Sequence, residues 1–179
     1  MDPLRQYEIA FVGLKKGITN FNYHIDDKFF ALFEGSLVEN AKVDVVLKFD
    51  KQQSFFNLQF QFEGRIHLPC DRCGVELDYP VDSEYSIVVK FDEHHEDEQD
   101  DSLADVVYIS RHDTHFSVAQ LIYEFVNLSI PINHVTCDNL REEEKPCDQK
   151  VLEQLKQSSS EEESTVDHRW DDLTKIKFN

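Results

Sequence analysis

Hydrophobic and polar residues alternate through the middle of the chain, which is the pattern of β-strands with one buried face. The alternation is most regular over residues 55–69 and less regular over residues 41–50. The polar stretch DKQQS between the two supplies a turn, so we expect an antiparallel hairpin or meander. The period of two places Phe56, Phe60 and Phe62 on one face. Core packing is favoured for that face over a platform that stacks RNA bases.

Further elements are expected on both sides of this hairpin. Strand composition predicts strands over residues 6–12, 85–91 and 105–110. Helical spacing of apolar residues predicts helices over residues 26–36, 117–130 and 147–157. Asp26 and Ser117 are the expected N-caps of the first two helices, and Gly35 and Pro131 are expected to end them.

These elements predict an α+β fold: an antiparallel, strongly twisted sheet or partial β-barrel with a few helices and a C-terminal peptide tail. Residues 1–157 are expected to form a single domain that carries an acidic loop at 92–104. Residues 158–166 are rich in Ser and Glu and predict a flexible acidic linker. Residues 167–179 are then a C-terminal docking peptide.

The charge of the chain restricts its partners. The sequence has 36 acidic against 18 basic residues, a formal net charge of −18. Such a chain repels phosphate, and non-specific nucleic-acid binding depends on Lys and Arg, so general RNA coating is disfavoured. A basic protein is the better partner. A local RNA contact would use Lys15 and Lys16 near the start of the chain and Arg65 and Arg72 around the cysteine motif.

The cellular location follows from two patterns. The N-terminal residues MDPLRQYEIAFVGLKKG lack the basic start and apolar stretch of a secretory signal, and no apolar run approaches the ~20 residues of a membrane span. We therefore expect a cytoplasmic protein with no membrane partner. In that reducing compartment, four cysteines favour a metal or free thiols over disulfides.

Cys70 and Cys73 form a C-x2-C knuckle that is followed directly by Gly74. Such a knuckle supplies two thiolates to a tetrahedral zinc ion, and glycine suits the tight turn. Cys137 and Cys147 are the candidates for the other two ligands, and His134 is an alternative ligand because it stands three residues before Cys137. Structural zinc and unligated thiols both stay open. Redox catalysis is disfavoured because strands, and no helix, are expected to flank the knuckle.

The C-terminal tail has an amphipathic pattern. Trp170, Leu173 and Ile176 are spaced three apart, so a short helix would place them on one side. Arg169 precedes this stripe, and we group it with the other three as partner-binding residues. A helix this short must dock in order to persist. Docking on a partner is favoured over docking on its own domain, because the lone Trp follows a polar, charged linker.

No pattern of an enzyme is present. The sequence lacks a Gly-rich phosphate loop, a G-x-S-x-G elbow and an H-E-x-x-H helix, and nothing assembles a nucleophile, a base and an orienting acid. The prediction is a protein without catalytic residues.

Several stretches occur in an order typical of one family: FVGLKKGITNFNYHIDDKFF, CDRCGVELDYPV, LIYEFVNLSIPI and DHRWDDLTKIK. The chain resembles the YceD-like family, associated with accumulation of large-subunit ribosomal RNA. The resemblance implies a ribosome-biogenesis accessory protein that supports synthesis, processing or stability of that RNA. Its partners would be the large-subunit precursor, its RNA or a basic ribosomal protein. Many members have a tight second cysteine pair, whereas nine residues separate Cys137 from Cys147 here.

Two other function classes stay open. A metal-dependent RNA-processing hydrolase would need an open metal position and a general base. A structural interaction module would have no direct role at RNA.

Overall fold

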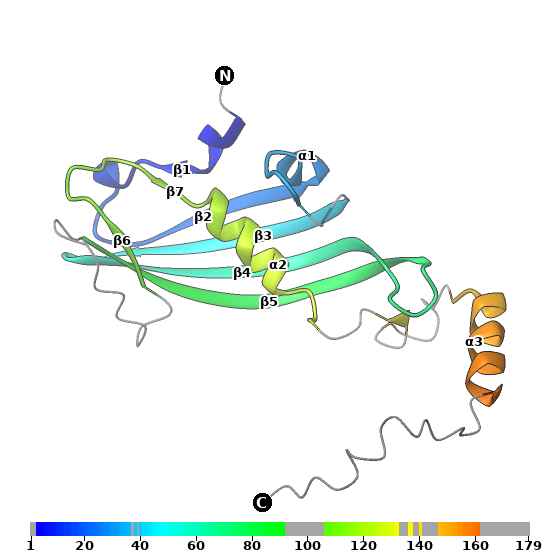
Figure 1. Cartoon of the computed structure of the whole chain (residues 1–179). Helices are drawn as coiled ribbons and strands as arrows, with labels where there is room; N and C mark the ends of the chain where they lie inside the picture. Colours follow the sequence, from blue (N-terminus) through cyan, green and yellow to red (C-terminus); the bar gives the residue numbers. More distant parts are fainter. Residues whose placement is uncertain are drawn as a thin grey trace, which may run out of the picture.

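The computed structural model describes residues 3–36, 38, 40–91, 106–132, 136, 137, 140 and 147–161. Its centre is a five-stranded sheet in the order β2-β3-β4-β5-β6 (Figure 1). The strands are β2 (Gly17–Asp26), β3 (Ala41–Lys51), β4 (Phe55–Pro69), β5 (Glu76–Phe91) and β6 (Val106–Ile109). The first four are antiparallel neighbours, and β6 runs parallel to β5.

The remaining elements are short. A second sheet pairs β1 (Glu8–Ile9) with β7 (Phe116–Ser117), and the 3₁₀ turns η1 (Pro3–Tyr7) and η2 (Phe11–Gly13) flank β1. The helices are α1 (Asp27–Phe30), α2 (Ala119–Leu128) and α3 (Gln149–Glu161). The fold is therefore α+β with strands dominant, as predicted, and its sheets are open and do not close into a barrel.

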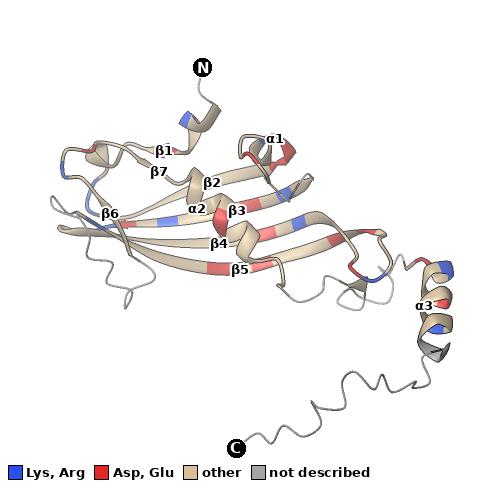
Figure 2. Ribbon diagram, in the orientation of Figure 1, with Lys and Arg blue, Asp and Glu red and all other residues tan. Residues whose placement is uncertain are grey.

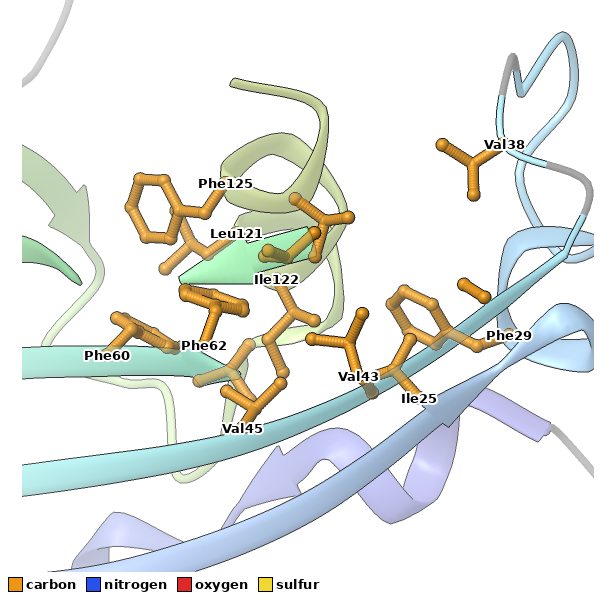
Figure 3. Packing of buried hydrophobic residues seen from close by; sticks show 14 of the residues in the cluster. Ile25, Phe29, Val38, Val43, Val45, Phe60, Phe62, Leu121, Ile122 and Phe125 are labelled. Atoms are coloured by element: carbon orange, nitrogen blue, oxygen red, sulfur yellow. The ribbon is translucent and has the colours of Figure 1, made fainter. Parts of the chain in front are cut away.

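The core lies on one face of the large sheet, between that face, α2 and the N-terminal segment (Figure 1). Strands β3 and β4 alternate strictly between buried and exposed positions, and their buried side chains face α2. Figure 3 shows Leu121, Ile122 and Phe125 of α2 above Phe60 and Phe62. The Phe125 ring centroid lies 5.2 Å from that of Phe60 and 6.2 Å from that of Phe62. These phenylalanines are core residues, as the alternation predicted.

Four local predictions were wrong. The helix expected over 26–36 was to end at Gly35, but α1 ends at Phe30. The amides of Leu32 and Phe33 bond to the carbonyls three residues before them, so the chain tightens into a turn and does not continue the α-helix. The strand expected over 6–12 is reduced to the two residues of β1. Two carbonyls there, those of Phe11 and Leu14, accept hydrogen bonds from Lys51 Nζ at 2.7 and 2.9 Å, which holds a turn in place of an extended strand. Ser117 is not the cap of α2, because it pairs with Glu8 in the small sheet and Val118 takes the N-cap position without a side-chain hydrogen bond. Strand β5 begins at Glu76, not at residue 85, because its first half pairs with β4.

Other boundaries agree more closely. Asp26 caps α1, where its carboxylate accepts from the backbone amides of Lys28 and Phe29. The last predicted helix is α3, which continues to Glu161 and so includes the first four residues of the expected linker. The rest of that linker, the docking peptide and the acidic loop at 92–104 lie outside the described residues. Within the part of the chain that the structure describes, no helix is long and apolar enough to cross a membrane.

Candidate metal centre

The C-x2-C knuckle is the turn of the β4–β5 hairpin. Strand β4 ends at Pro69 and β5 begins at Glu76, so the six residues between them must reverse the chain. Two backbone hydrogen bonds of 2.8 Å close the turn, one from the Cys70 amide to the Val75 carbonyl and one from the Gly74 amide to the Cys70 carbonyl. Gly74 has a φ of +71°, which a residue with a Cβ rarely adopts. This turn points both cysteines toward the interior.

Three thiols meet at this turn. The sulfurs of Cys70, Cys73 and Cys137 lie within 4.8 Å of one another. The Cys137 sulfur is 3.5 Å from that of Cys70 and 3.7 Å from that of Cys73. All three residues are buried, and Cys137 is completely shielded from solvent. The structure thus brings the knuckle together with a cysteine more than sixty positions away, as the four-ligand hypothesis requires.

Cys147 lies just before α3 and belongs to the segment that leads into that helix. Its side chain is half-buried and packs against the core, and its thiol contributes to raising the pKa of Cys137. The group of sulfurs that lie within 4.8 Å of one another consists of the other three cysteines. Asp148 follows it and caps α3, because its carboxylate accepts from the amides of Lys150 and Val151 at 2.9 and 3.4 Å. Cys147 therefore stands immediately before the capped N-terminus of α3.

Backbone amides prepare Cys70 to ionise. Burial by itself would raise the pKa of the Cys70 thiol, but hydrogen bonds from the amides of Cys73, Arg72 and Cys137 outweigh it and lower the pKa to about 7. Amide donors of this kind could not be found from residue types alone, because they depend on how the turn closes.

Cys137 is shifted in the opposite direction. Burial raises its pKa, and hydrogen bonds with the thiols of Cys147, Cys70 and Cys73 raise it further. A second thiolate beside Cys70 is therefore disfavoured unless a cation shares the site.

The separations of the sulfurs can be compared with known sulfur chemistry. All four cysteines are free. A zinc–thiolate bond of about 2.3 Å places the sulfurs of a tetrahedral site about 3.8 Å apart, whereas a disulfide needs about 2.05 Å. The separations of 3.5 and 3.7 Å match the first value. The cluster is compatible with a metal site, and its soft, closely spaced thiols fit zinc.

The predicted RNA-contact residues fall at opposite ends of the sheet. Lys15 and Lys16 precede Gly17, which pairs with Lys51 of β3, whereas Arg65 pairs with Lys42 at the other end of β3. The stretch of β3 between these positions spans roughly 30 Å. Arg65 also forms an ion pair with Asp78 at 3.9 Å. Arg72, in the knuckle, lies at the Arg65 end, so these cations form two sites and not one.

The other predicted site residues lie outside the described part of the chain. They are the alternative ligand His134 and the four partner-binding residues Arg169, Trp170, Leu173 and Ile176.

Comparison with known protein families matches residues 58–177 to the family described as large ribosomal RNA subunit accumulation protein YceD. The chain belongs to the YceD family. The match covers about two thirds of the sequence and includes most of β4, all of β5, α2 and α3, and all four cysteines. The comparisons with curated proteins and with solved structures gave no match. Membership of the YceD family confirms the resemblance seen in the sequence, although the first of the four stretches, at residues 11–30, lies outside the match. The family is named for RNA accumulation and not for an enzymatic reaction.

Proposed function

We propose that this YceD-family chain is a non-enzymatic accessory factor that supports the synthesis, processing or stability of large-subunit ribosomal RNA. One observation carries the proposal: the family match begins in β4 and extends to residue 177, so it includes both the cysteine cluster and the C-terminal segment. The process named by the family concerns accumulation of the RNA, which fits a factor that protects or matures a precursor particle.

Within this function the cysteine cluster is proposed to be a structural zinc site. Cys70, Cys73, Cys137 and Cys147 would hold the ion, which would neutralise their thiolates and connect the β4–β5 turn to the segment that leads into α3. The support is the separation of the sulfurs and the absence of a disulfide among the cysteines. Four protein ligands leave no position for water, so such a site would not serve a hydrolase.

The partner is proposed to be a basic ribosomal protein of the large subunit. A net charge of −18 would speed the encounter with a cationic protein and shield that protein until RNA displaces the acidic chain. The C-terminal residues Arg169, Trp170, Leu173 and Ile176 are proposed to add a second contact to the particle.

The test is a depletion experiment in cells of the source organism. Loss of the gene should lower the ratio of large- to small-subunit ribosomal RNA, and the wild-type gene should restore it. In a low-salt sucrose gradient the protein should sediment with large-subunit precursors and not with mature ribosomes. An unchanged RNA ratio after depletion, with the protein only among small soluble proteins, would contradict the proposed function.

A further inference from the structure

The large sheet has a second face that no described element covers. Helix α2 and the N-terminal segment lie on one side of the sheet only (Figure 1). On the other side, the outward positions of β3, β4 and β5 are exposed along most of their length. We call this side, formed by the outward side chains of β3, β4 and β5, the open face.

Carboxylates are aligned across the open face. Asp44 of β3 is directly opposite Glu63 of β4, and Glu63 is directly opposite Asp82 of β5. Like charges at directly opposed positions destabilise a sheet, because their side chains are only about 5 Å apart. Glu84 lies two residues along β5, on the same face, and extends the row into a patch. Figure 2 shows acidic positions on these neighbouring strands. We call Asp44, Glu63, Asp82 and Glu84 the carboxylate row.

The described residues do not neutralise this row. Asp44 contacts the His24 ring at 2.8 Å, and Glu84 accepts a hydrogen bond from the Gln61 side chain at 2.8 Å. Glu63 and Asp82 have no ion pair with any residue in the described part of the chain. Glu63 and Asp82 therefore carry negative charge without an ion pair in the middle of the open face. Cations lie further along the same face, Lys42 and Arg65 toward one end and Lys48 toward the other.

A shallow hollow adjoins the carboxylate row. Its volume is about 400 Å³, and its lining includes Val46, Lys48, Gln59, Gln61, Glu84 and Ser86. Val46 is 40% exposed and gives the hollow an apolar part of its lining. An arginine or lysine has an apolar stem and a charged head, so its stem can cover Val46 while its head reaches Glu84. The amide oxygens of Gln59 and Gln61 offer further hydrogen-bond acceptors.

We propose that the open face is the docking surface for an extended basic segment of a partner protein, whose arginines and lysines bind the carboxylate row. This inference rests on the proposed function, and it specifies the surface that a basic partner would occupy. Charge complementarity selects this occupant, because RNA and a second copy of this acidic chain would both be repelled by the row. Arginine is favoured over lysine, since its planar guanidinium can bind carboxylates in a bidentate manner.

The experiment compares two variants of the full chain with equal net charge. The face variant carries Glu63→Gln, Asp82→Asn and Glu84→Gln. The control carries Glu8→Gln, Glu34→Gln and Glu153→Gln, which are exposed carboxylates away from the open face. The probe is a synthetic peptide of alternating arginine and serine. The face variant should bind it about tenfold more weakly than the wild type, and the control less than about twofold more weakly. Melting temperature should not fall in the face variant, because its substitutions remove repulsion.

Equal weakening in both variants would show that only net charge matters and would overturn the proposal, as would binding that is unchanged in the face variant. NMR provides an independent check, since the amide resonances of Val46, Gln61 and Ser86 should shift on addition of the peptide. The affinity for an rRNA fragment is measured for the same variants. If the face variant loses affinity for that fragment as well as for the peptide, RNA is the occupant and the proposal is overturned.

Complementation separates this inference from the proposed function. If the wild-type gene restores large-subunit ribosomal RNA and the face variant restores it equally, the docking surface is wrong while the function stands. If the wild-type protein itself has no effect on that RNA, the function fails.

Discussion

Cys137 connects the two halves of the candidate metal centre. Its sulfur contacts those of Cys70 and Cys73, and its pKa is raised in part by the Cys147 thiol. The knuckle alone has two ligands on one turn, which is too few for a structural zinc site. The metal hypothesis therefore depends on Cys137. In the sequence, the only reason to associate Cys137 with the knuckle was that it is a cysteine.

Substitution of the fourth ligand distinguishes the two proposed ligand sets. Cys147→Ser should reduce bound zinc from one equivalent to well below one, measured by elemental mass spectrometry of purified protein, because three thiolates leave the site incomplete. His134→Gln is the matched control and should retain one equivalent. The reverse result would establish three thiolates and one imidazole as the ligands, and zinc-free wild-type protein would contradict both sets.

Gly64 is a second residue at which the structure sets a strict requirement. It lies in β4 opposite Val43, and a Cβ added there would come within 2.2 Å of the Lys42 carbonyl oxygen and 2.6 Å of the Val43 Cα. Both contacts are with backbone, so relief requires movement of β3. Gly64→Ala should lower the free energy of unfolding by about 1–3 kcal/mol, measured by urea denaturation. Gly13→Ala is the control, because a Cβ there meets no atom within 4 Å. Equal stability of the two variants would show that β3 yields at little cost.

The ligand residues could be proposed from the sequence, but their convergence could not. Cys70-x2-Cys73 followed by Gly74 predicts a tight turn, and that turn is present. The nine residues between Cys137 and Cys147 gave no indication that both thiols approach one point. Their positions depend on where α2 ends and where α3 begins in space, which is a property of the tertiary fold.

At the scale of elements, β3 and β4 were predictable because one face of each is fully buried and the other exposed, which produces a strict alternation. Strand β2 was not predicted, although Phe21, Tyr23 and Ile25 alternate with polar residues, because its inward side chains are mostly half-buried and the signal is weaker. The first half of β5 contains Pro80, which argues against a strand. Pairing with β4 overrides that preference, since Pro80 sits opposite Arg65.

The linkage between the cysteine cluster and α3 predicts how the protein responds to metal removal. Helix α3 contacts the core through Val151 and Leu152, and its other described side chains are largely exposed. A zinc ion held by Cys147 would add a strong attachment at its N-terminus. Treatment with a high-affinity chelator should therefore increase amide hydrogen exchange in α3 at least about tenfold. Strands β3 and β4 are the internal control and should keep their protection. Unchanged exchange in α3 would show that the helix is held without metal.

At the scale of the whole molecule, the surfaces proposed to bind a partner are the open face and the C-terminal segment, and the open face does not belong to the hydrophobic core. The described part of the chain buries most of its aromatic residues on one side of the sheet, and it leaves the open face mainly polar, with Val46 and Phe55 exposed there. The lone Trp of the sequence stands at position 170, outside that described part and inside the family match. A large aromatic residue in a charged segment is the type of residue that contributes most to binding a partner.

Trp170→Ala therefore tests whether the C-terminal segment binds a partner or its own domain. If it binds a partner, the substitution should cost about 2 kcal/mol, or about thirtyfold in Kd for the precursor particle, and the protein should leave the precursor fractions of a sucrose gradient. Its melting temperature should equal that of the wild type. Phe178→Ala is the matched control, because in a helix Phe178 would face away from the stripe formed by Trp170, Leu173 and Ile176. A large fall in melting temperature for Trp170→Ala, without loss of sedimentation at permissive temperature, would instead place the segment on its own domain. The partner contact would then have to come from the folded sheet, which makes the open face the next surface to mutate.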